Sequence, residues 1–515
     1  MEILRKIASV GPNREALTIK LVVISTISSI GYLQYGYSFW VSTIIFERMK
    51  LLHNIHSNTT EQRSEMSLYM VMSKLAVFVF AIGGILGCFC TGPLLDGYGR
   101  KTTLIINSLL SIISAFIMGY SNVVDRYAYT LFSCFLSGVC SGIGSCAIPI
   151  YIGELSPSSV RGAIICFVTL AFAVGTSMAQ FLTQIKSIAS HEGLAFLMII
   201  SGSLSAVGFV TMPFFPESPR FLLIQKGNEE KATEALKKLR GTADVEEEIE
   251  DMNQEDIIEK AEKGMGLCKL MCFQGLRWHI ISLVVLIVGQ QFSGISVVYS
   301  YSDDIFMKVG VTEEMLPYIV LTTSLFAFLI VIVLTYIIDS VGRRKVLLLG
   351  LGINSFFCVL LTMSLELQSS APWMSYISTC SVFIFLIGQN IGPGPVPNVL
   401  MVEIFLQSSR TSACVFGKGF QWLLSLIKTI VFYFIQSFFG TYIFLVFWPI
   451  CTATLIYVFK MIPETKQMSF VAIRREMAIQ IGKTIKGRSG QQFRRRSTQS
   501  SLRGRAKGRR KTMKR

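Results

Sequence analysis

The residues best suited to chemistry in this chain are carboxylates and arginines in three motifs, each of which occurs twice. D-G-Y-G-R returns as D-S-V-G-R, a Glu and an Arg seven positions apart return at the same spacing, and P-E-S returns as P-E-T. The two copies are separated by 243 to 249 residues. Arginines and carboxylates form charge-assisted, often bidentate pairs. The members, with two neighbouring arginines, are Asp96, Arg100, Glu154, Arg161, Glu217 and Arg220, then Asp339, Arg343, Arg344, Glu403, Arg410 and Glu464.

Three motifs repeated in register predict a duplicated protein whose charged residues meet at the ends of its helices. Pairs of this kind between two bundles would hold one face closed, and they must break when that face opens. We therefore interpret the twelve residues as a gate network on the cytosolic side.

The elements that carry these motifs are apolar runs of membrane-spanning length. Of 515 residues, 51% are hydrophobic and 16% are charged, against about 25% charged in soluble domains. The runs are close to 20 residues, the length at which a helix crosses a bilayer. The sequence predicts an all-α membrane protein with twelve transmembrane helices in two pseudo-symmetric six-helix bundles. The predicted segments are a cytosolic N-terminus (1–20), a first bundle (21–215), a cytosolic linker with short helices (216–278), a second bundle (279–462) and a basic, disordered cytosolic tail (463–515).

The distribution of basic residues predicts the orientation. Loops on the side of the linker and both termini are rich in Lys and Arg, which places them in the cytosol. Arg48, Lys50 and Arg63 fall on the opposite side, so the bias is imperfect. Asn58 begins an N-T-T acceptor for N-glycosylation in the first outward loop. We expect a glycosylated, multi-pass protein of the plasma membrane.

Other kinds of chemistry find little support. The twelve cysteines lie mostly in apolar runs, where free cysteine packs as a small hydrophobic side chain. Cys268 and Cys272 are close in sequence, but no histidine or second cysteine pair completes a zinc site. We predict no metal, no cofactor and no enzymatic activity.

Four longer stretches identify a family. P-E-S-P-R-F-L-L-I-Q-K-G begins at Pro216, G-Q-Q-F-S-G-I-S-V-V-Y-S-Y begins at Gly289, and G-P-G-P-V-P-N-V-L-M-V-E-I-F-L-Q-S-S-R begins at Gly392. The fourth, P-E-T-K, begins at Pro463. Together they resemble the facilitative hexose transporters, in the sugar porter branch of the major facilitator superfamily. The resemblance extends from the first helix to Lys466 and is strongest to the fructose-transporting members.

The resemblance implies facilitated transport of a hexose, with fructose as a candidate, by alternating access. Proton-linked relatives have an aspartate after the G-Y pair of the first helix, where this chain has Ser38. A serine cannot exchange a proton at physiological pH, whereas an intramembrane carboxylate can, which favours uniport. Three prolines after Gly392 are expected to break the tenth helix. The implied substrate-binding residues are Tyr35, Thr169, Gln290, Gln291, Ser296, Gln389, Gln421 and Trp422.

Several of these positions depart from the family pattern. Thr169 stands where a glutamine is expected, and Ser296 and Ser425 stand where asparagines are expected. Gln389 and Gln421 replace histidines of the fructose-type members. Outside the substrate-binding positions, Cys134 stands where the fourth helix of the family normally has an arginine before its charge network. The shorter side chains predict a wider and less complementary cavity.

Two lysines, Lys74 and Lys428, lie within apolar runs, where a charge is costly unless it faces water or a partner. Each is either a cavity cation that favours an anionic substrate or a lysine that reaches the interface. The interface is favoured for Lys74, and the two interpretations are even for Lys428. Two alternatives to a hexose uniporter therefore stay open: a non-transporting, sensor-like relative with a drifted site, and a carrier of a non-sugar, anionic solute.

The tail carries most of the net charge. From Glu464 onward there are seventeen Lys or Arg and two Glu, in a chain of net charge +16. Basic residues at the cytosolic face are attracted to anionic lipid by about 1 kcal/mol each. We predict the lipid bilayer and a small-molecule hexose as partners, and no nucleic acid.

Overall fold

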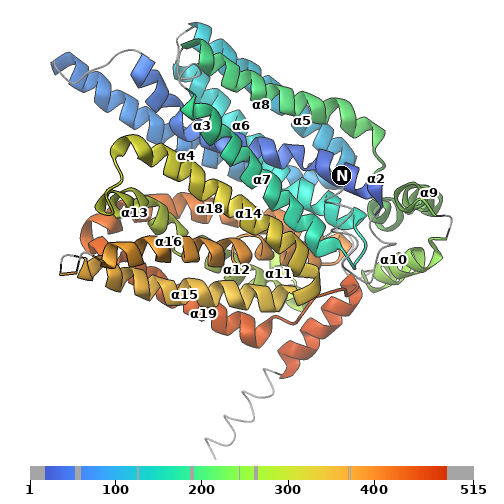
Figure 1. Ribbon diagram of the computed structural model, residues 1–515. Coiled ribbons are helices and arrows are strands. Elements are labelled where there is room, and N and C mark those ends of the chain that lie inside the picture. The colour runs from blue at the N-terminus through green and yellow to red at the C-terminus, as the bar shows by residue number, and fades with distance from the viewer. Residues whose placement is uncertain are drawn as a thin grey trace, which may run out of the picture.

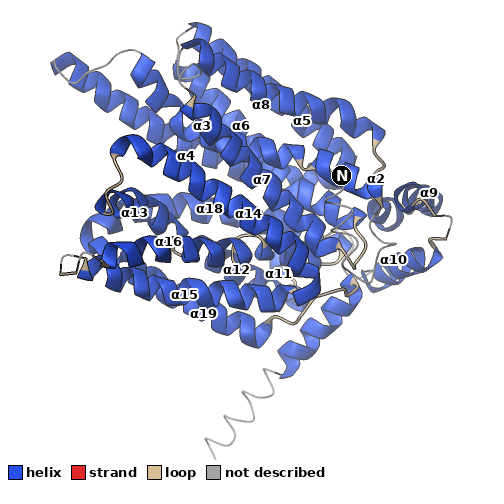
Figure 2. Ribbon diagram, in the orientation of Figure 1, coloured by secondary structure: helices blue, strands red, loops and turns tan. Residues whose placement is uncertain are grey.

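The computed structural model describes residues 18–52, 60–124, 127–185, 191–242, 244–259, 265–368, 370–371 and 373–483. Within these ranges the chain is helical, with short connecting loops and no strand (Figure 2). Asn58, the start of the chain and the most basic part of the tail lie outside the described residues, so the predictions made for them stay predictions.

The first half forms one bundle, drawn from blue to green in Figure 1. Its apolar side chains pack both within the bundle and towards the other half, and the largest buried cluster contains residues of both halves. The helices are α2 (Ile19–Ser28), α3 (Ile30–Leu52), α4 (Thr60–Tyr98), α5 (Arg100–Val124), α6 (Tyr127–Leu155), α7 (Arg161–Gln184) and α8 (His191–Thr211).

The second half forms the other bundle, drawn from yellow to red (Figure 1). Two of its membrane segments are broken. The predicted proline break in the tenth segment is confirmed, because α16 ends at Ile391 and α17 begins at Val396. The seventh segment breaks at Gly294, which has a φ of 96° that favours glycine. The helices are α12 (Arg277–Gln291), α13 (Ile295–Lys308), α14 (Leu316–Val341), α15 (Arg343–Leu367), α16 (Met374–Ile391), α17 (Val396–Glu403), α18 (Gln407–Phe439) and α19 (Ile443–Met461).

The linker between the halves folds into short helices at one end of the bundles (Figure 1). They are α9 (Glu229–Arg240), α10 (Glu246–Glu259) and α11 (Leu267–Cys272). Asn228 caps α9 by accepting a hydrogen bond from the Lys231 N–H, and Gly241 ends it in the left-handed conformation. We call this end of the molecule the linker face.

Ten described segments are long and apolar enough to cross a membrane. The consecutive helices α2 and α3, and the helix α8, occupy the places predicted for the first and sixth spans. The predicted all-helical, two-bundle architecture is confirmed.

Close helix packing in the first half depends on glycine. A Cβ on Gly87 of α4 would lie 2.1 Å from the Val139 carbonyl oxygen, and one on Gly138 of α6 would lie 2.1 Å from the Phe80 oxygen. With Gly83 and Gly142 these residues form a G-x-x-x-G pair on each helix. Small residues at this spacing let two backbones approach within a membrane.

The structure differs from the prediction of a tail that is disordered throughout 463–515. Residues 470–483 form a helix at the linker face. Its apolar residues explain the difference, since Phe470, Ile473 and Met477 recur at helical spacing and are buried.

Candidate functional site

At the linker face, each half contains the same cluster of an arginine and two glutamates. In the first half, the Arg100 guanidinium and the Glu154 carboxylate are 3.0 Å apart, and both side chains are fully buried. The backbone N–H groups of Arg100 and Lys101 donate to Glu217 at 3.1 Å. Ser218 donates its hydroxyl to Glu154. Glu217 is half-buried as it accepts these bonds, and this partial burial raises its pKa.

The second half repeats three of these contacts. Arg343 pairs with Glu403 at 3.0 Å, and its backbone N–H donates to Glu464 at 2.8 Å. Thr465 donates to Glu403 at 2.6 Å in the role of Ser218. The duplicated motifs therefore build duplicated sites, as the sequence predicted.

Two contacts then join the two halves across the linker face. Arg410 of α18 lies 3.6 Å from Glu154 of α6. The backbone N–H of Ala163 on α7 donates to Asp339 of α14 at 2.8 Å. Asp339 also pairs with Arg343 at 2.8 Å. These contacts hold the linker face closed.

Phe470 of the tail helix lies at the centre of this closed face. Its ring is within 3.8 Å of the Arg161 guanidinium carbon, 4.0 Å of that of Arg410 and 4.7 Å of that of Arg220. Arginines prefer such positions over aromatic faces. Since Arg161 and Arg410 come from different halves, one ring connects both.

The linker helix α10 supplies two acids that sequence reasoning missed. Glu255 pairs with Arg220, lies 3.6 Å from Arg410 and accepts the Gln407 N–H at 3.1 Å. Glu259 accepts the Ser408 N–H at 2.9 Å. Both therefore cap the N-terminus of α18, where negative charge is stabilised. Burial, followed by the charge of Glu255, raises the pKa of Glu259 to about 7.

Asp96 is exposed at the end of α4 but remains at the network, beside Arg100, Gln225 and Thr411. Two other residues discussed at the sequence level lie elsewhere. Arg344 donates to the Phe459 carbonyl at the end of α19 and does not join the cluster. Cys134 is buried in an apolar cluster with Tyr37 and Leu197, 20 residues before Glu154 on α6 and so about 30 Å from it along the helix. A change at Cys134 therefore does not touch the network.

A cavity of about 240 Å³ lies between the two halves. The first half contributes two tyrosines, a phenylalanine and two hydroxyl groups, whereas the second contributes amides, a lysine and a tryptophan. The lining residues are Tyr32, Tyr35, Ser145, Thr169 and Phe172 from the first half, and Gln290, Gln291, Asn390, Gly394, Asn398, Lys418, Gln421, Trp422 and Ser425 from the second.

Six of the eight predicted substrate-binding residues line this cavity: Tyr35, Thr169, Gln290, Gln291, Gln421 and Trp422. The other two do not. Gln389 is buried and accepts a hydrogen bond from Asn354 at 2.9 Å, and Ser296 lies past the break of the seventh segment, away from the cavity lining. Substrate binding by all eight stays a prediction.

Gln290 has a geometry suited to ligand binding. Its Nε2 donates to the Gly394 carbonyl at 2.6 Å, in the break between α16 and α17. Its Oε1 is buried and has no hydrogen-bond partner among the residues that the structure describes. A buried acceptor without a partner is costly, and a ligand hydroxyl in the cavity would satisfy it.

Aromatic rings close one side of the cavity. Trp422 lies 5.6 Å from Tyr35 and 5.8 Å from Phe80 between ring centroids. Tyr35 in turn lies 4.9 Å from Phe172. Trp422 belongs to α18 and the other three to the first half, so this cluster also connects the halves.

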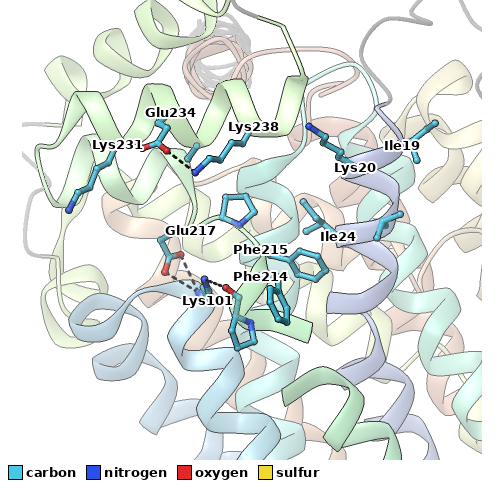
Figure 3. Close-up of a pocket in the computed structure, with 14 residues that line it drawn as sticks. Ile19, Lys20, Ile24, Lys101, Phe214, Phe215, Glu217, Lys231, Glu234 and Lys238 are labelled. Carbon is cyan, nitrogen blue, oxygen red and sulfur yellow. Dashed lines mark hydrogen bonds and ion pairs between the residues drawn. The ribbon is translucent and has the colours of Figure 1, made fainter. Parts of the chain in front are cut away.

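A larger hollow, of about 650 Å³, lies outside the cavity between the two halves. It is a groove on the linker face between α2, α9 and the chain after α8 (Figure 3). Phe214 and Phe215 line it, and two of its four lysines have local contacts: Lys238 with Glu234 at 2.7 Å and Lys101 with the Pro213 carbonyl at 2.6 Å.

Two helical bundles that enclose a polar cavity and close over one end of it by ion pairs define a membrane carrier of the alternating-access class. The family model for sugar (and other) transporters matches residues 24–477. The chain belongs to this family.

Its relatives agree over nearly the whole length. The chain is 38% identical to the facilitated glucose transporter member 5 of solute carrier family 2 from Equus caballus, over 89% of this chain and 92% of that protein. It is 36% identical to member 7 from Homo sapiens, over 91% and 92%. The proton:xylose symporter XylE, solved with 6-bromo-6-deoxy-D-glucose, has the same fold, with a TM-score of 0.74 at 20% identity over 87% of this chain and 97% of that one.

Proposed function

We propose that this protein carries a hexose across a membrane by facilitated, alternating-access transport. The observation that carries the proposal is the cavity between the halves, which combines amide and hydroxyl groups with aromatic rings. Sugars require several neutral donors and acceptors and an apolar surface beside them. The relatives named as facilitated glucose transporters support the same substrate class.

The first membrane segment supports uniport. Ser38 is buried and lies 3.3 Å from the Ser201 hydroxyl. Hydroxyl groups do not titrate near neutral pH, so this pair offers no site for a coupling proton.

In this proposal the linker face is the cytosolic gate. Inward opening separates Arg410 from Glu154 and Ala163 from Asp339, while the pairs within each half persist. We further propose that the protein lies in the plasma membrane with both termini in the cytosol. Asn58 would then be glycosylated outside the cell, and the basic tail would lie against anionic lipid.

The test is counterflow of radiolabelled glucose and fructose in liposomes that contain the purified protein. We expect saturable hexose flux, with Gln290→Ala and Gln291→Ala each raising KM about tenfold, because each removes a hydrogen bond worth about 1.5 kcal/mol. Gln389→Ala is the matched control, since Gln389 is a glutamine of the same bundle that accepts a hydrogen bond from Asn354 and does not line the cavity.

Unchanged KM in both cavity variants would contradict the site. Absence of any flux in protein that is folded and inserted would contradict transport and favour the sensor-like alternative.

A further inference from the structure

One residue of the cavity wall, Lys418, carries a charge that the recognition of a neutral sugar does not require. Lys418 of α18 is 4% exposed and lines the cavity. Its ammonium donates to Asn398 Oδ1 at 2.7 Å and to Gln421 Oε1 at 3.0 Å. Both partners are neutral amide oxygens, and they leave one of its three N–H groups for a ligand.

Among the described residues, no acid balances this charge. Within the part of the chain that the structure describes, neither an aspartate nor a glutamate lies within ion-pair distance of Lys418 or lines the cavity. An ammonium ion removed from water costs several kcal/mol unless a negative group pairs with it. Burial of the Lys418 ammonium therefore has a desolvation cost that an anionic ligand would offset.

A second lysine lies further along the same helix. Lys428 donates to Gln291 Oε1 at 3.3 Å, and Gln291 lines the cavity. Ten residues separate Lys418 from Lys428, which is about 15 Å along a helix. Because α18 begins at the linker face, Lys428 lies on the far side, where a solute would enter while the linker face is closed. The two lysines give this route a positive field that steers anions.

The rest of the cavity is built for hydroxyl groups. Gln290 offers its unpaired oxygen, Asn390 and Thr169 add polar groups, and Tyr35 and Trp422 add ring surfaces. The volume of about 240 Å³ is small for a binding pocket and suits a single monosaccharide. One ammonium without an arginine suits a carboxylate better than a phosphate, which recruits more donors.

We propose that the cavity takes a sugar acid, a hexose-sized polyhydroxy monocarboxylate such as a hexuronate, with the carboxylate paired to Lys418. This inference rests on the proposed transport function and extends its substrate class from neutral hexoses to sugar acids. Lys428 acts earlier, by attracting the anion to the entrance.

The test is counterflow of radiolabelled glucuronate beside glucose and fructose, in liposomes containing the full-length protein. We expect saturable glucuronate flux in the wild type. Lys418→Gln, which keeps hydrogen-bonding capacity but loses the charge, should lower kcat/KM for glucuronate about 10- to 100-fold, the range for losing a charged hydrogen bond. The ratio of kcat/KM for glucuronate to kcat/KM for hexose should fall about tenfold in this variant, because neutral hydroxyls depend more on the amides than on the charge.

Two further variants define the role of charge. Lys428→Gln should lower glucuronate flux less than Lys418→Gln and make it less sensitive to salt. Lys269→Gln removes an exposed lysine on α11 and should leave both fluxes unchanged. Size-exclusion profiles and melting temperatures establish that each variant is folded.

The outcomes separate this inference from the proposed function. Hexose flux that neither glucuronate nor gluconate inhibits overturns the sugar acid and leaves hexose transport standing. If hexose flux instead requires chloride, a small inorganic anion pairs with Lys418, and the sugar acid is again overturned. Glucuronate flux without hexose flux supports the inference and overturns the neutral hexose. No flux of either in folded, inserted protein overturns both.

Discussion

The network at the linker face is symmetric, whereas the cavity is not. Arg100, Glu154 and Glu217 have the same mutual contacts as Arg343, Glu403 and Glu464. In the cavity, by contrast, most of the rings come from the first half and the amides and the lysine from the second. Both halves must close the same face, so the same contacts serve both. A sugar has no twofold symmetry, so the walls that hold it differ.

This contrast separates two kinds of mutational effect. Changes in the network should act on the stability of the closed form, and changes in the cavity should act on ligand affinity.

The largest effect is expected from Glu154→Ala. It leaves Arg100 buried without its carboxylate and removes the contact with Arg410 across the halves. Breaking a buried ion pair costs about 3–5 kcal/mol, so the melting temperature in detergent should fall strongly. Glu403→Ala should cost less, because Arg343 keeps Asp339.

The control is Glu234→Ala, which removes an exposed partner of Lys238 and should not change the melting temperature. Equal effects of Glu154→Ala and Glu234→Ala would mean that the buried network does not hold the fold.

The next largest effect is expected from Phe470→Ala, at about 3 kcal/mol for loss of a buried ring. Opening of the linker face can be followed by maleimide labelling of the buried Cys166, five residues beyond Arg161 on α7. Labelling should become faster. Phe470→Leu keeps an apolar side chain but loses the contacts with three arginines, and it should have a smaller effect of about 1 kcal/mol. Labelling at the wild-type rate in both variants would show that the ring does not join the halves.

A substitution beside the cavity should lower ligand affinity and leave the stability of the protein nearly unchanged. A Cβ on Gly84 would lie 2.7 Å from the Trp422 ring, which must then shift. We expect Gly84→Ala to raise KM for the transported sugar about tenfold with little change in melting temperature, a loss of about 1.4 kcal/mol in binding. Gly97→Ala, where a Cβ meets nothing within 4 Å, is the matched control. A large loss of stability in Gly84→Ala with an unchanged KM would contradict the distinction between the network and the cavity.

The smallest effect is expected from pH. In the closed form the pKa of Glu259 is about 7, because of burial and the charge of Glu255; on opening, the carboxyl returns towards its ordinary value. At a pH below the ordinary pKa of glutamate, Glu259 is protonated in both the closed and the open form, and the preference for the closed form is fully present. It is lost as the pH rises through about 7.

Labelling of Cys166, normalised to the exposed Cys272, should therefore accelerate severalfold between pH 6 and pH 8. Glu259→Gln should remove this dependence. A dependence that survives in Glu259→Gln would assign the titration to another group.

The sequence was sufficient to predict the two bundles and their charge network, because the repeated motifs lie at helix ends with fixed spacing. Glu154 to Arg161 and Glu403 to Arg410 repeat seven positions apart, and this repetition identifies equivalent places in two bundles. The partners of these residues on α10 could not be predicted, because Glu255 and Glu259 lie in an acidic helix where a surface position is the ordinary expectation. Only the folded chain brings them to α18.

The cavity was predicted in part. Gln290 and Gln291 were found through a motif, but Lys418 was missed because it stands between two glycines near the start of its apolar run. One signal was present: Lys418 precedes Gln421 by three positions and Trp422 by four, so the three share a helix face. Gln389 shows the converse case, since this polar residue of the expected segment accepts a hydrogen bond from Asn354 on a neighbouring helix and does not line the cavity.

Trp422 lies against Gly84, Tyr35 and Phe80 of the opposite half and is almost completely buried. Indole emission depends on the polarity around the ring, so a ligand that enters the cavity and halves that move apart would each alter its colour and intensity. The chain has five tryptophans, and replacing the other four with phenylalanine would leave one native fluorophore that reports the transport cycle in real time without an attached dye.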